Sequence, residues 1–267
     1  MDRISGAIVR VQRSLSVAWM LAAREWVADF RQSRMTPVWP VVQPLAYAVL
    51  FVALRPLIGG SVVDRPIEFG VFVFIGFSLW QSWYEGMRAQ MDAIGRHKGL
   101  MSRGELGVAT LVAATAMSSA VQLVPRLVLG VVAALVFLPA GFPAVLGFVA
   151  FGVLTLANGV VIGALLQPFS TLSPDLGKSI QSFSLALIMT GAVFIPVPAQ
   201  VGNLLGALFA ANPMGMMLNA ARAPLFSDPW INPAAVWFWV LFTVVVGVLI
   251  PVIGRRVLPI VVERLGG

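Results

Sequence analysis

Apolar residues fill long uninterrupted stretches of this chain, and polar residues gather in the short segments between them. A helix needs about 20 residues to cross a hydrocarbon core about 30 Å thick. Six stretches approach or reach that length: 38–57, 69–85, 112–138, 144–167, 180–196 and 234–253. Lipid offers no hydrogen-bond partner to an open sheet edge, so these stretches are predicted to be helices. The predicted fold class is an all-α membrane protein with six transmembrane helices in one domain, residues 1–267.

Residues 1–36 have a different pattern, in which apolar and basic positions separate at helical spacing. One predicted face holds Ile8, Val11, Leu15, Trp19, Ala22, Trp26 and Phe30, and the opposite face holds Arg10, Arg13, Arg24 and Arg31. This pattern predicts an N-terminal amphipathic helix lying in the membrane interface. The interfacial residues expected here are Trp19, Trp26, Arg31, Arg34 and Trp39. A cytosolic helix packed against a partner is the alternative, and both descriptions can hold together.

Two connections between the predicted spans have structure of their own. Segment 86–107 is too polar to enter lipid, yet Met87, Met91 and Ile94 recur at helical spacing. We expect a short amphipathic helix there that packs against a partner. Segment 197–233 contains two apolar pieces divided by Asn212-Pro213, each too short to span a bilayer. They are predicted to form short re-entrant helices on the outer side before the last span.

The formal net charge of +7 is informative through its distribution along the chain. Arginine and lysine are dense before the first span, after the second and after the sixth, and sparse in the alternate connections. By the positive-inside rule this places both termini in the cytoplasm, which agrees with an even number of spans. The positive charge therefore indicates topology, and no nucleic-acid partner is expected.

Catalytic and metal-binding residues are sparse. The chain has no cysteine, a single histidine (His97) and eleven acidic residues that are scattered singly. Gly177-Lys178-Ser179 resembles the end of a phosphate-binding P-loop, but that motif requires glycine at position 172, where this chain has leucine. We therefore expect a protein that is not an enzyme, has no cofactor and binds no metal. Asp175 is instead expected near the start of the fifth span, at the positive end of that helix.

Glu85 and Arg126 are the ionisable residues expected near membrane depth. Such residues are costly in lipid, so they pair, reach the interface or serve a transport path. One interpretation is that these two pair or extend to the interface. The other is that Arg126 faces a central path and meets an anionic group of the substrate.

Aromatic side chains are enriched in the first two predicted spans. The candidates for a translocation path are Tyr47, Phe77, Trp80, Trp83 and Tyr84, with Arg126. Aromatic rings offer flat apolar faces that stack on sugars without fixing one hydrogen-bond pattern. An ordinary interfacial belt is the alternative for Trp39, Trp83 and Tyr84, which lie near span ends. Trp80 is deeper and is the stronger candidate.

Five segments in order resemble one family. They are FRQSRMTPVWPVVQP before the first span, FVFIGFSLWQSWYEG in the second, GRHKGLMSRGEL after it, FSTLSPDLGKSIQ before the fifth, and AANPMGMMLNAARAPLF on the outer side. Together they resemble the permease subunit of ABC type-2 polysaccharide exporters of the O-antigen and capsule kind. Thr36-Pro37 and the proline-rich FIPVPAQ segment depart from that family's pattern and leave the particular polymer open.

The resemblance implies a multi-pass subunit of the bacterial cytoplasmic membrane. It would act as a homodimer with two copies of a cytoplasmic ABC ATPase, and would export a lipid-linked polysaccharide through a channel between its two copies. Segment 86–107 would be the ATPase-coupling region, with Arg88, Asp92, Arg96, His97 and Lys98 as its contact residues.

Two other functions remain open. An ABC type-2 exporter of a drug or lipid would have the same fold, with a dry lateral opening to the membrane in place of an aromatic path. An ion-coupled carrier or a membrane enzyme would need paired or clustered ionisable residues within the spans. The sequence shows no such cluster, so this function ranks third.

Overall fold

The computed structural model describes residues 2–32, 35, 38–58, 65–103, 106–138, 140–194, 204–228 and 232–266. Every regular element in these ranges is helical. The α-helices are α1 (Asp2–Gln32), α2 (Trp39–Ile58), α3 (Pro66–Arg96), α4 (Lys98–Ser102), α5 (Val108–Phe137), α6 (Phe142–Leu172), α7 (Pro174–Thr190), α8 (Leu204–Ala211), α9 (Pro213–Arg222) and α10 (Pro233–Gly266), and a 3-10 turn η1 (Ala223–Leu225) follows α9. The predicted all-α class is confirmed over these residues.

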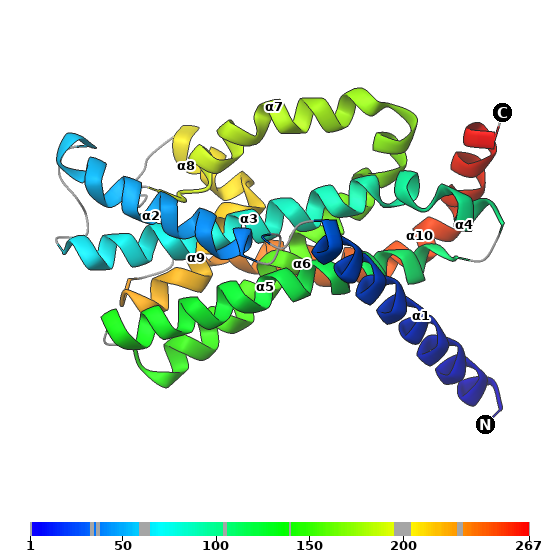
Figure 1. Cartoon of the computed structure of the whole chain (residues 1–267), viewed down its shortest axis with the longest axis horizontal. Helices are drawn as coiled ribbons and strands as arrows, with labels where there is room; N and C mark the ends of the chain where they lie inside the picture. Colours follow the sequence, from blue (N-terminus) through cyan, green and yellow to red (C-terminus); the bar gives the residue numbers. More distant parts are fainter. Residues whose placement is uncertain are drawn as a thin grey trace.

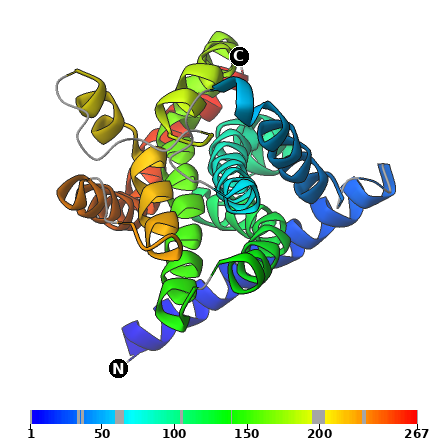
Figure 2. The same cartoon turned by 90° about the vertical axis from the view of Figure 1, so that its left-hand side faces the viewer.

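Helix α3 lies at the centre of the bundle and contacts α2, α5, α6 and α9 (Figures 1 and 2). Its residues from Phe69 to Leu79 are buried almost without interruption, except Gly70, which is half-buried. Helix α10 runs beside α6, and α1 crosses the bundle obliquely against α5. One end of the bundle carries α4 and the C-terminus, and the opposite end carries the short helices α8 and α9 (Figure 1).

Among the described residues, three helices are long and apolar enough to cross a membrane: α5, α6 and the part of α10 from Pro233 to Gly254. They correspond to the third, fourth and sixth predicted spans. The first, second and fifth predicted spans are also helical, as α2, α3 and α7. Helix is confirmed over the second predicted span, over 39–57 of the first and over 180–190 of the fifth, because α7 ends at Thr190. The count of six spans stays a prediction.

Helix α3 differs from its predicted form, because it continues without a break from Pro66 to Arg96. The expected span 69–85 and the expected short helix after it are therefore one element. Met87, Met91 and Ile94 are buried inside the chain itself, against residues of α1, α5 and α6. The apolar face that was expected to need a partner is covered by this chain.

Close contact between α3 and α6 depends on two glycines of α6. A methyl group at Gly159 would overlap the backbone carbonyl oxygen of Trp83, and one at Gly163 would overlap that of Met87. The two backbones can approach this closely only where no side chain intervenes, as in many helix pairs in membranes. Gln167 and Ser170 then donate hydrogen bonds to the carbonyls of Gln90 and Met91, at 2.9 and 2.8 Å.

Helix α1 presents two apolar surfaces, where the sequence predicted one. Ala18 and Ala22 are buried. Val17 and Leu21 pack against the C-terminal end of α3 and the N-terminal end of α5. Trp19 and Trp26 lie on the outer side, 58% and 42% exposed. Helix α1 thus packs on the bundle with one face and leaves its tryptophans outward, which is compatible with both predicted roles.

Candidate functional site

A buried ion pair links α3 and α5 at the point where the sequence placed its two membrane-depth ionisable residues. The Arg126 guanidinium is 1% exposed and donates to both carboxylate oxygens of Glu85, at 2.9 and 3.1 Å. It also donates to the Ser82 hydroxyl at 2.9 Å and to the carbonyl of Pro40 at 3.1 Å. The paired interpretation is therefore the observed one, and Arg126 joins α2, α3 and α5 in this chain.

An aromatic row, defined as Tyr47, Phe77, Trp80 and Tyr84, runs along the contact of α2 and α3. Ring centroids lie 4.2 Å apart for Tyr47 and Phe77, 5.4 Å for Phe77 and Trp80, and 5.3 Å for Trp80 and Tyr84. The three residues of α3 share a face because their spacing is three and then four residues. Tyr47, Trp80 and Tyr84 are half-buried, so part of each ring stays accessible.

Trp80 contributes its ring to this row and no hydrogen bond. Its indole Nε1 is buried and has no hydrogen-bond partner among the described residues. Trp80 and Tyr84 stack almost in parallel, with an interplanar angle of 7°. Contacts with this row would therefore be made through ring faces.

Trp83 lies apart from the row. It is 3% exposed, and its Nε1 donates to the Asn158 side-chain oxygen on α6 at 2.8 Å. Asn158 in turn donates to the Thr243 hydroxyl on α10 at 2.8 Å. Trp83 thus belongs to a buried polar contact that ties α3, α6 and α10 together, and it is neither in the row nor at the surface of this chain.

The predicted coupling residues at the end of α3 make contacts within the chain. Arg88 donates to the carbonyl of Gly177 at the start of α7, at 2.9 Å, and lies 3.8 Å from Asp92. Arg96 and His97 both approach the Glu25 carboxylate of α1, at 3.7 and 3.3 Å. These residues therefore connect α3 to α1 and α7.

The interfacial residues of the sequence analysis also have defined positions. Trp39 begins α2 and is 57% exposed, and Arg31 is exposed in the last turn of α1. Lys98 is exposed at the start of α4. Arg34 lies outside the described residues, as do parts of segment 197–233.

Arg222, at the end of α9, is a functional candidate that sequence reasoning missed. Its guanidinium is buried, lies 3.6 Å from the centre of the Phe72 ring, and donates to the carbonyls of Ala192 at 2.7 Å and Val193 at 3.2 Å. Burial lowers the pKa of Arg222 to about 9, opposed by the nearby charge of Asp228. The sequence feature that could have identified Arg222 is that it is the single cation in the apolar, methionine-rich α9 segment.

The start of the short helix α9 is held by an asparagine cap. Asn212 precedes α9, and its side-chain oxygen accepts from the Gly215 N–H at 3.2 Å. Its amide donates to the Thr190 hydroxyl at 3.0 Å and to the Leu187 carbonyl at 3.2 Å. Together Asn212 and Arg222 fix α9 against the end of α7.

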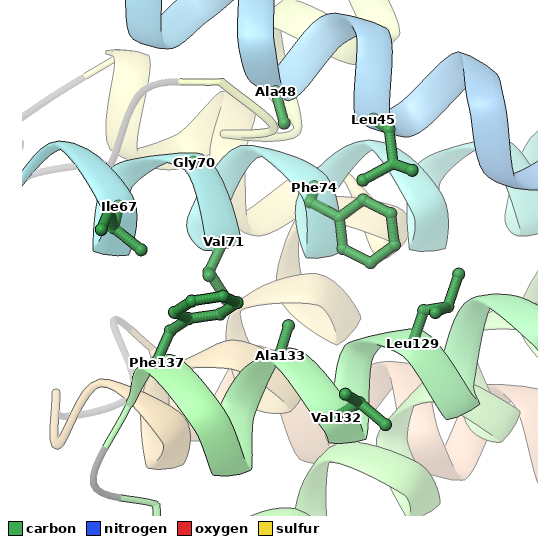
Figure 3. A pocket seen from close by; sticks show the side chains of 10 residues that line it. All are labelled: Leu45, Ala48, Ile67, Gly70, Val71, Phe74, Leu129, Val132, Ala133 and Phe137. Atoms are coloured by element: carbon green, nitrogen blue, oxygen red, sulfur yellow. The ribbon is translucent and has the colours of Figure 1, made fainter.

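An apolar groove of about 310 Å³ lies between α2, α3 and α5, near the bundle end that carries α8 and α9 (Figures 1 and 3). Leu45 and Ala48 line it from α2, and Val71 and Phe74 from α3. Ala133, Phe137 and their neighbours close it on α5. No charged side chain lines the groove in the described part of the chain.

A second hollow, the interfacial cavity, measures about 510 Å³ and lies beneath α1. Glu25 lines it from α1, Glu85, Arg88 and Arg96 from α3, and Ser118 and Gln122 from α5. Most of its lining residues are polar or charged, whereas the groove is lined by apolar residues. The chain therefore has a hydrocarbon-compatible hollow near one end and a charged one nearer the other.

The chain matches the family model described as ABC-2 type transporter over residues 16–226. This range includes the end of α1, the aromatic row, the Glu85–Arg126 pair and α9. A comparison with curated proteins gives no match.

Proposed function

Because the chain belongs to the ABC-2 type transporter family, in which it is a membrane component, we propose that it exports a lipid-linked polysaccharide. The O-antigen and capsule class of cell-surface glycans is the proposed substrate. Two copies of the chain would form the passage, and two copies of a cytoplasmic ABC ATPase would supply the energy. The proposed location is the bacterial cytoplasmic membrane, with six spans and both termini inside.

The aromatic row is the observation that carries the choice of substrate. Tyr47, Phe77, Trp80 and Tyr84 present a nearly continuous set of rings with neighbouring centroids between 4.2 and 5.4 Å apart. A polymer of sugars must move past its transporter in many small steps, so it needs contacts that tolerate displacement. Stacking on ring faces meets this need, because each successive sugar can occupy the same ring.

The Glu85–Arg126 pair supports an external energy source. A carrier driven by ions needs an ionisable group that can change its partner or its proton within the membrane. Here both carboxylate oxygens of Glu85 accept from Arg126, and further donors of Arg126 are bound by Ser82 and Pro40. These hydrogen bonds favour a structural role for Arg126. Because a structural Arg126 leaves this pair unable to couple transport to ions, the arrangement also favours an ATP-driven mechanism.

The proposed ATPase contact is the polar surface around the end of α3, within segment 86–107. The apolar side of this region packs inside the chain, while Asp92, Arg96 and Lys98 remain exposed. Arg88 reaches α7 and Arg96 reaches α1. A push on this surface by an ATPase would therefore act on three helices at once.

Export of a lipid or drug is the second candidate, and the apolar groove favours it. Its uncharged lining suits an acyl chain or an apolar drug (Figure 3). The groove and the aromatic row lie on different sides of α2 and α3, so the two candidates make separate predictions for mutations. Filling the groove would impair lipid export, and removing rings would impair polysaccharide export.

The test is an export assay in inverted membrane vesicles that carry a lipid-linked glycan in their outer leaflet, with ATP supplied outside and glycan measured in the lumen. Trp80→Ala removes one ring of the row and should lower glycan export several-fold without loss of assembly. Trp80→Phe keeps a stacking face and should retain most of the activity. Full export by Trp80→Ala, together with loss of export in the groove-filling variant Gly70→Leu, would replace the polysaccharide by a lipid or drug.

A further inference from the structure

We propose that the interfacial cavity binds the phosphoethanolamine headgroup of a bilayer phospholipid. This site is independent of which substrate the protein exports. It rests on five observations about the cavity: its charges, the state of its ion pairs, its hydroxyl and amide groups, the lack of aromatic side chains among its described lining residues, and its position.

The charges that line the cavity are balanced. Glu25 and Glu85 supply two carboxylates, and Arg88 and Arg96 supply two guanidinium groups. A purely anionic ligand would meet both carboxylates, and a purely cationic one would meet both arginines. A zwitterion with a phosphate at one end and an ammonium group at the other can place each charge against its opposite.

Three of these four groups, Glu25, Arg88 and Arg96, have no ion-pair contact shorter than 3.3 Å, the distance from Glu25 to His97. Arg96 lies 3.7 Å from Glu25, and Arg88 lies 3.8 Å from Asp92, distances beyond a well-formed hydrogen bond. By contrast, Arg126 holds Glu85 at 2.9 Å. A phosphate could therefore bind Arg88 and Arg96 without breaking a strong ion pair. Both arginines also keep one bond to a backbone carbonyl, of Gly177 and Ala89, which fixes their direction.

The remaining lining groups suit the ester oxygens of a headgroup. Ser118, Ser119 and Gln122 line the cavity from α5. Their side chains have no hydrogen-bond partner within the described ranges, and they are half-buried. They can therefore donate to phosphate or glycerol oxygens.

The lining selects a primary ammonium over a quaternary one. Quaternary ammonium groups are recognised by aromatic cages, because they cannot donate a hydrogen bond. No aromatic side chain is among the described residues that line the cavity. Carboxylates such as Glu25 accept hydrogen bonds from a primary ammonium, so ethanolamine fits this cavity and choline does not.

The position of the cavity points to the bilayer as the source of the ligand. Helix α1 covers it, and Trp26 follows Glu25 directly on that helix. Trp19 and Trp26 face outward, and tryptophans of this kind lie at the level of the lipid headgroups. The cavity volume of about 510 Å³ falls within the usual range of ligand sites.

The test uses the full chain, purified in detergent and stripped of lipid, with adducts counted by native mass spectrometry. Dioleoyl phosphatidylethanolamine, phosphatidylcholine and phosphatidylglycerol are added separately at equal concentration. We expect the ethanolamine lipid to bind on the order of fivefold more than either other lipid, the size expected for one charge-assisted hydrogen bond at a partly exposed site. Equal binding of the three lipids would overturn the proposal.

Variants locate the binding. Ser118→Leu fills the cavity and Glu25→Gln removes the carboxylate that accepts from the ammonium group, so each should abolish the preference for the ethanolamine lipid. Ala109→Leu adds similar bulk at an exposed position of α5 and should leave the preference unchanged. A preference retained in both folded cavity variants would place the lipid elsewhere and refute the site. Displacement of the lipid by free O-phosphoethanolamine at the same concentration would refute the bilayer source.

Discussion

The Glu85–Arg126 pair yields an asymmetric prediction, because its two members differ in exposure. Arg126 is 1% exposed, whereas the Glu85 side chain is 35% exposed and borders the interfacial cavity. Glu85→Gln leaves a buried guanidinium without its counter-charge, and water has little access to it. Arg126→Met leaves a carboxylate that water can reach through the cavity. Removing the acid should therefore be more destabilising than removing the base.

The magnitudes follow from the bonds in the structure. Glu85→Gln removes the counter-charge and at least one of two charge-assisted hydrogen bonds, which should lower the free energy of unfolding by about 3 kcal/mol, the lower end for a broken buried pair. Arg126→Met also removes the neutral-acceptor bonds to Ser82 and Pro40, but the only charge it leaves is a carboxylate that water can reach, so about 1–2 kcal/mol is expected. The double variant should be more stable than Glu85→Gln alone, because it leaves no unpaired charge.

The assay is denaturant unfolding of the purified protein in detergent, followed by tryptophan fluorescence. Glu68→Gln is the matched control, because its partner Arg65 has a side chain that is 79% exposed. That surface pair should contribute at most about 1 kcal/mol. The reasoning is refuted if Arg126→Met is the more destabilising single change, or if the two effects simply add.

Three further predictions concern other parts of the chain. Gly163→Ala should separate α3 from α6 and lower the free energy of unfolding by several kcal/mol. Gly147→Ala is the control, because its methyl group would meet no neighbour within 4 Å, and it should be neutral or slightly stabilising. Equal effects of the two variants in thermal unfolding would contradict the close packing. Lys98→Glu should weaken co-purification of the ATPase, whereas Arg65→Glu, at the opposite end of the bundle, should not; unchanged recovery with Lys98→Glu would remove that residue from the contact. Burial lowers the pKa of Arg222 to about 9, so the folded chain loses this proton more readily than the unfolded chain. The wild type should therefore gain stability relative to Arg222→Met as pH rises through about 9. A difference in free energy of unfolding between the two proteins that does not change with pH in this range would contradict that pKa.

The sequence predicted features that depend on spacing along one helix. Residues 77, 80 and 84 fall on one helical face, which is why the aromatic row was recognisable. The same rule does not separate Trp83 from the row, because Trp83 lies three residues after Trp80. Its role in the buried contact with Asn158 depends on α6, which lies 75 residues further along the chain.

Features that depend on packing between distant segments were not predictable from the pattern alone. The polar residues after position 85 indicated that the second helix left the membrane, but they did not show that it continued unbroken to Arg96. Burial of Met91 and Ile94 depends on α1, α5 and α6 arriving at the same place. The contacts of Arg222 were likewise not predictable, because they include backbone carbonyls, which every residue type presents equally.

We propose that this chain supplies a passage and takes its energy from a separate ATPase. Glycan transport is measured into sealed proteoliposomes that contain the chain alone, or the chain together with a Walker-motif ATPase identified by co-purification. Transport is expected only when both proteins and hydrolysable ATP are present. Transport by the chain alone, without ATP and without the ATPase, would contradict the proposal.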